Sequence, residues 1–126
     1  MARLKGSVGE SATNSRPDVK YVQYLLTDWR LSSGGRSLAI DGIAGPLTIA
    51  AIREFQRANS GVVDGRVDPN GPAVRWLEYC HLSHIASGIR PLDYLGKQSV
   101  TPPPFGRLTV DVQAARYLDG LRNSYG

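Results

Sequence analysis

The chain has 126 residues, a formal net charge of +4, 41% hydrophobic residues and a single cysteine, Cys80. This length fits one compact domain, or a smaller domain with an appendage. The lone cysteine excludes an internal disulfide, and no apolar run approaches the roughly 18 residues that span a bilayer. The 15 Lys and Arg residues are spread along the chain. That spread favours loose attraction to a polyanion without specifying nucleic acid, acidic lipid or a carboxylate-rich cell wall.

The first third of the chain predicts an arm followed by a helix. Residues 1–16 are rich in Gly, Ser, Thr and Asn and are interpreted as an irregular N-terminal arm. No apolar stretch follows the basic start, so we expect no secretory signal peptide. From Pro17, apolar residues recur every three or four positions, which predicts an amphipathic helix ending near Gly34. Tyr21 and Tyr24 fall off this stripe, and we expect both to be partly exposed. The stripe consists of Val19, Val22, Leu25, Leu26 and Trp29.

Two similar units follow, each an Asp-Gly turn and then a Gly-Pro helix start. Residues 41–42 precede 45–46 in the first unit, and residues 64–65 precede 71–72 in the second. Each proline can occupy the first helical position. Helices are predicted from 46 to about 57 and from 72 to about 87. Their predicted buried stripes are Ile49, Ile52 and Phe55, then Ala73, Trp76, Leu77 and Cys80.

Three helices with short connections predict a small all-α domain over residues 17–88. The remaining residues, 89–126, differ in composition. Pro91, Gly96 and the prolines at 102–104 favour an extended, stiff connector. Thr109 is then expected to cap a final helix that docks on the domain. Binding a partner and beginning a further domain are the alternatives. The apolar face of this helix is Val110, Ala114, Tyr117, Leu118 and Leu121.

Four short motifs in the chain carry a family resemblance. Residues 18–26 read Asp-Val-x-x-Val-Gln-x-Leu-Leu, residues 41–48 read Asp-Gly-x-x-Gly-Pro-x-Thr, and residues 51–56 read Ala-Ile-x-x-Phe-Gln. A second Asp-Gly is followed by Arg-Val-Asp-Pro at residues 66–69. Together they resemble the three-helix peptidoglycan-binding module of bacterial and phage hydrolases and type VI secretion effectors. The resemblance covers roughly residues 10–80 and implies a non-catalytic wall binder that carries an enzyme or effector.

The resemblance directs attention to the loops around the second helix as a ligand site. A helix that begins at residues 45–46 presents free amides near Thr48, which attract a carboxylate. Arg53 and Gln56 lie one turn apart, and we expect them to be exposed, where they can meet a carboxylate and an amide. Arg66, between two acidic residues, supplies charge or an internal ion pair. For each loop, a purely structural role is the alternative. The candidate peptidoglycan-binding residues are Asp41, Gly42, Gly45, Thr48, Arg53, Gln56 and Arg66.

Cys80, His81 and His84 form the cluster that invites an enzymatic interpretation. Cys80 and His84 are four residues apart on a helix, but no third zinc ligand is evident from the spacing. As a nucleophilic pair they lack a visible orienting residue. We therefore expect no catalytic residue, no metal and no cofactor.

Two further expectations concern partners and place of action. The alternative function is a protein–protein adaptor for a secreted or phage-like effector, built on the same helical scaffold. No nucleic-acid partner and no membrane insertion are expected. The site of action is expected to be the cell envelope or periplasm, reached by another route or after removal of a signal, with the cytoplasm as the alternative.

Overall fold

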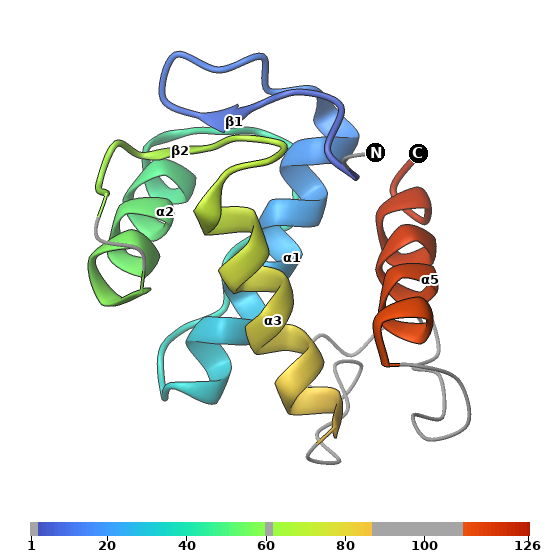
Figure 1. Ribbon diagram of the computed structural model, residues 1–126. Coiled ribbons are helices and arrows are strands. Elements are labelled where there is room, and N and C mark those ends of the chain that lie inside the picture. Colours follow the sequence, from blue (N-terminus) through green and yellow to red (C-terminus); the bar gives the residue numbers. More distant parts are fainter. Residues whose placement is uncertain (1–2, 60–61, 87–109) are drawn as a thin grey trace.

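The computed structural model describes residues 3–59, 62–86 and 110–126. Helix α1 (Arg16–Ser32) lies at the centre of this part of the chain and contacts α2 (Pro46–Asn59), α3 (Pro72–Ala86) and α5 (Val110–Asn123). In Figure 1, α2 and α5 lie on opposite sides of α1. The predicted all-α fold is confirmed, and α2 and α3 begin at the predicted prolines. None of the helices in the described ranges has the length and apolar character needed to cross a membrane.

The N-terminal segment contributes to the core, which its composition does not predict. Strand β1 (Val8–Gly9) pairs antiparallel with β2 (Arg66–Val67), with Val8 opposite Val67 (Figure 1). Leu4 and Val8 are almost fully buried. Two-residue strands carry no periodicity that a sequence pattern could reveal. The predicted boundaries at residues 16 and 88 stay a prediction.

The central position of α1 explains one wrong prediction. Its apolar stripe is buried as predicted, but Tyr21 and Tyr24 are also fully buried rather than partly exposed. A helix with neighbours on several sides buries more than one stripe. The Tyr21 hydroxyl donates a 2.5 Å hydrogen bond to Glu78 on α3. Burial, together with the Glu78 carboxylate, raises the pKa of Tyr21 well above its ordinary value.

The buried face of α3 agrees with the predicted stripe at Ala73 and Leu77 but not at Trp76. Its buried face includes Ala73, Val74 and Leu77, whereas Trp76 is 44% exposed. The prediction that Trp76 belongs to the buried stripe is therefore wrong. Val74 and Leu77, three residues apart, belong to the hydrophobic core, and this direction turns Trp76 toward solvent.

Helix α5 docks on the module, as predicted. Tyr117, Leu118 and Leu121 join the common hydrophobic core. The Arg122 Nε donates a 2.8 Å hydrogen bond to the Asp18 carboxylate at the start of α1, and both side chains are buried. The predicted Pro-rich connector and Thr109 cap, and the end of α3 near residue 87, lie outside the described residues.

Candidate functional site

The first Asp-Gly loop is organised by a glutamine on α1. The Gln23 side-chain nitrogen donates to Asp41 Oδ1 at 2.9 Å and lies 3.0 Å from Thr48 Oγ1. Its side-chain oxygen accepts a 2.9 Å hydrogen bond from the Gly42 amide. The Asp41 carboxylate also accepts from the Ile43 amide at 2.9 Å, closing an Asx turn. Gln23 and Thr48 are both buried.

The second Asp-Gly loop repeats this arrangement with a glutamine on α2. The Gln56 side-chain nitrogen donates to Asp64 Oδ1 at 2.9 Å and to the Arg66 carbonyl at 3.0 Å. Its oxygen accepts from the amides of Asp64 at 3.1 Å and Gly65 at 2.9 Å. Asp64 closes its own Asx turn with the Arg66 amide at 3.0 Å. The weak duplication in the sequence therefore corresponds to two equivalent glutamine–turn networks.

Glycine and aspartate have specific roles in these turns. Gly42 and Gly65 have φ values of 78° and 73°, a left-handed conformation that other residues adopt at a cost. Hydrogen bonds to their charged forms hold the pKa of both aspartates below the ordinary value. The largest cause of the lowered pKa of Asp41 is the hydrogen bond from the Ile43 amide. For Asp64 it is the hydrogen bond from the Gln56 side chain.

The seven candidate ligand residues do not converge on one hollow. Asp41, Gly42, Gly45 and Thr48 lie at the N-terminal end of α2, whereas Gln56 is near its C-terminal end, about 12 Å farther along the axis. The prediction that Gln56 is exposed is wrong, because it is 3% exposed and its amide serves the second turn.

The two candidate arginines are both paired with acidic side chains. Arg53 is half-buried, 3.7 Å from the Glu10 carboxylate. The Arg66 Nε lies 2.9 Å from Asp68 Oδ1. This contact is the internal ion pair that the sequence analysis gave as one role of Arg66.

In the cluster of Cys80, His81 and His84, both histidines contact Asp28 on α1. His84 Nδ1 lies 2.7 Å from Asp28 Oδ2, and His81 Nδ1 lies 3.2 Å from the same atom. His81 Nε2 is 2.7 Å from the Tyr117 hydroxyl, which ties α3 to α5. Burial raises the pKa of Cys80, so its thiolate is scarce at neutral pH. Across the described residues, no group of three or more Cys, His, Asp or Glu is placed to hold a metal ion.

A small hollow lies between the second Asp-Gly loop and the start of α3. It has a volume of about 160 Å³ and is lined by Gln56, Asp64, Arg66, Asp68 and Pro72, among others. We call it the interhelix hollow. It brings one guanidinium and two carboxylates to the same concave surface, and it includes two of the seven candidate residues.

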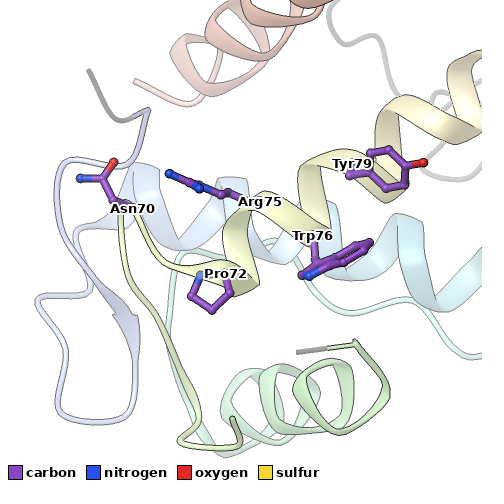
Figure 2. Close-up of a pocket in the computed structure, with 5 residues that line it drawn as sticks. All are labelled: Asn70, Pro72, Arg75, Trp76 and Tyr79. Atoms are coloured by element: carbon purple, nitrogen blue, oxygen red, sulfur yellow. The ribbon is translucent and has the colours of Figure 1, made fainter. Parts of the chain in front are cut away.

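A larger hollow follows α3 away from the loop. It has a volume of about 680 Å³, within the range of roughly 300–1,000 Å³ typical of small-ligand sites. We call it the aromatic hollow; its residues are Asn70, Pro72, Arg75, Trp76 and Tyr79. Figure 2 shows Arg75 extending toward Asn70, with Trp76 and Tyr79 farther along the helix. Sequence reasoning missed this surface because it assigned Trp76 to the core. The signal was available in Trp76 and Tyr79, which are three residues apart on one helix.

The described part of the chain is thus a small helical module in which the interhelix hollow and the aromatic hollow both lie beside α3. Residues 15–78, just over half of the chain, match the family described as "Putative peptidoglycan binding domain". The chain belongs to this peptidoglycan-binding domain family. No curated protein and no solved structure matches it. The match includes both glutamine–turn networks and Trp76, and it ends just before Tyr79.

Proposed function

We propose that this protein binds peptidoglycan non-covalently, without cleaving it, and so holds itself or an associated enzyme or effector at the bacterial wall. The family match over α1, α2 and the first half of α3 is the observation that carries this proposal. The cell envelope is then its place of action. A single module of this size buries little ligand, so we expect a weak affinity, about micromolar to millimolar.

The interhelix hollow supports a contact with the stem peptide. Peptidoglycan stem peptides carry carboxylates and amides, and in many walls a free amine. Arg66, held by Asp68 at 2.9 Å, offers a guanidinium to a carboxylate. The exposed carboxylate of Asp64 lines the same hollow and suits an amine.

The other candidate residues have supporting roles in this proposal. Asp41, Gly42, Gly45 and Thr48 shape the first loop, and Gln56 shapes the second. Arg53 links α2 to the N-terminal segment through Glu10. Arg66 is therefore the candidate residue that we retain as a direct ligand contact.

The test is incubation of the purified chain with protein-free peptidoglycan sacculi, followed by centrifugation and chromatography of the supernatant. We expect the protein to leave the supernatant and no soluble muropeptide to appear. Arg66→Ala is expected to weaken pelleting, whereas Arg57→Ala, an exposed arginine on α2, is not. Release of muropeptides would show a wall hydrolase instead.

A protein–protein adaptor is the second candidate function. Exposed Trp76 and Tyr79 beside Arg75 favour it, since Trp, Tyr and Arg dominate binding energy at protein interfaces. An adaptor predicts that the protein stays in the supernatant with sacculi.

A further inference from the structure

The aromatic hollow exposes large apolar side chains that the core does not use. Trp76 is 44% exposed and Tyr79 is 61% exposed. Their rings meet edge to face, with centroids 5.7 Å apart and planes at 88°. The pair therefore forms a two-sided aromatic corner on the outer face of α3 (Figure 2). A cluster of exposed aromatic residues beside a concavity is typical of a binding site.

The polar groups around this corner have no partner within the described part of the chain. The Arg75 guanidinium and the Asn70 amide make neither a hydrogen bond nor an ion pair there, and the same holds for the Tyr79 hydroxyl. Arg53 and Arg66, by contrast, each face a carboxylate. The hollow thus combines apolar ring faces with free donors and one uncompensated positive charge.

We propose that the aromatic hollow is a subsite for the glycan strand of peptidoglycan. An N-acetylhexosamine has an apolar C–H face and a rim of hydroxyl and acetamido groups. One face stacks on the Trp76 indole, the Tyr79 ring contacts its edge, and Asn70 meets the polar rim. This inference rests on the proposed function, and it identifies the sugar as the part recognised at this surface.

The sizes of the two hollows support this division of the ligand. At about 680 Å³ the aromatic hollow lies within the range of roughly 300–1,000 Å³ typical of small-ligand sites, whereas the interhelix hollow, at about 160 Å³, lies below it. Both are lined by Pro72, so they adjoin at the start of α3. In peptidoglycan the stem peptide is attached directly to the glycan. One muropeptide can therefore place its sugar on Trp76 and its peptide toward Arg66.

Arg75 has a separate role in this arrangement. Its charge has nothing to neutralise on a neutral sugar, but it complements the carboxylates of an attached stem peptide. Removal of Arg75 should therefore affect binding of a muropeptide and not binding of an oligosaccharide that lacks the peptide. This difference separates recognition of the sugar from attraction of charge.

The experiment uses ¹⁵N-labelled full-length chain and follows the two indole N–H signals by NMR. Trp76→Phe assigns them, and the Trp29 signal serves as an internal reference because Trp29 packs against Phe55. The probes are the tetramer of β-1,4-linked N-acetylglucosamine, a soluble muropeptide and the free stem peptide. We expect the tetramer and the muropeptide to shift the Trp76 signal in a saturable manner. The free peptide should shift it far less, and the Trp29 signal should stay in place.

Variants read at the same Trp76 signal sharpen the test. Tyr79→Ala should weaken tetramer binding about tenfold, because it removes one wall of the corner. Arg75→Ala should leave tetramer affinity within about twofold and weaken muropeptide binding several-fold. Arg57→Ala, which lies outside the hollow, should change neither. All three replaced side chains are exposed, so an unchanged melting temperature confirms that the variants are folded.

Two results would overturn the proposal. One is a Trp76 signal that stays in place with about 10 mM tetramer, a concentration that detects even millimolar affinity. The other is a shift of equal size with the free stem peptide. Either result leaves sacculus binding by the whole chain unaffected, and so leaves the proposed function standing. Failure of the chain to pellet with sacculi would instead contradict both the proposed function and the glycan subsite.

Discussion

At the scale of single residues, Gln23 and Gln56 explain why the two Asp-Gly turns hold their shape. Each glutamine inserts a buried side-chain amide into a turn, where it accepts from a backbone N–H and donates to the turn's aspartate. Buried amides of this kind usually have partners, and loss of the partner costs more than an exposed hydrogen bond contributes.

The first prediction concerns stability. Gln56→Ala should lower the free energy of unfolding by about 2 kcal/mol or more, because it leaves the amides of Asp64 and Gly65 without their acceptor. Gln23→Ala should have a similar effect through the Gly42 amide. Urea unfolding followed by circular dichroism measures both changes.

Arg57→Ala is the matched control for these variants, since it shortens an exposed side chain on the same helix as Gln56. Its cost should stay within about 0.5 kcal/mol. If Gln56→Ala were as mild as this control, the second turn would not depend on the glutamine.

The second prediction follows from the lowered pKa of Asp41 and Asp64. A carboxylate whose pKa is lower in the folded state stabilises the fold above its unfolded pKa of about 3.9. That contribution is lost as the pH falls through the folded pKa. The free energy of unfolding should therefore decline below about pH 4.

The double variant Asp41→Asn/Asp64→Asn isolates this effect, because asparagine cannot titrate there. Urea unfolding at pH 7, 4 and 3 should give a shallower decline for this variant than for the unmodified chain. Equal declines would mean that other carboxylates carry the whole acid sensitivity.

The residue scale is also where sequence reasoning was least successful. The motif spacing located the two Asp-Gly loops, but the prediction that Gln56 is exposed was wrong. A glutamine on a polar face of a helix has the same local pattern whether it is solvated or covered by a loop. Gln56 is covered by a turn that begins eight residues later, and helical periodicity does not report such a contact.

At the scale of elements, α5 is an integral part of the fold. Asp18 at the start of α1 accepts from Arg122, and from the backbone amides of Lys5 at 3.2 Å and Gly6 at 3.1 Å. This single buried carboxylate therefore joins the N-terminal segment, α1 and α5. Removal of one partner of a buried ion pair lowers the free energy of unfolding strongly, because the other charge stays buried without its partner.

The third prediction is that Arg122→Ala destabilises the chain by about 3 kcal/mol, with Asp18 left buried and only partly compensated. Thermal unfolding by calorimetry measures the change. Asp119→Ala is the control on the same helix, because its ion pair with Arg3 is more than half exposed on the aspartate side and should contribute less than about 1 kcal/mol. Equal effects of the two variants would contradict a buried attachment of α5.

The helices were the most predictable elements. Apolar spacing together with Pro46 and Pro72 identified α1, α2 and α3, and the apolar face of residues 114–121 predicted the docking of α5. The pairing of β1 with β2 was not predictable, since it joins two short segments almost 60 residues apart. The exposure of Trp76 was missed because the predicted stripe included both Trp76 and Leu77, whereas the buried face runs through Val74 and Leu77.

At the scale of the whole molecule, the family fold carries two adjoining surfaces beside α3. The glutamine–turn networks shape the loops around α2, and the interhelix and aromatic hollows lie side by side at the start of α3. Binding to a polymer with many repeats would raise the apparent affinity of such a weak module through rebinding and multivalency. In the proposed function, the positive net charge would add long-range attraction to a carboxylate-rich wall.

The most direct test of the central claim is a binding isotherm of the full-length chain on protein-free peptidoglycan sacculi, with cellulose as the control polymer. The account predicts saturable binding to sacculi, little binding to cellulose and a supernatant free of muropeptides. Binding that never saturates, or that is equal on cellulose, would contradict a specific wall-binding module. So would a protein that stays in solution at about millimolar concentration.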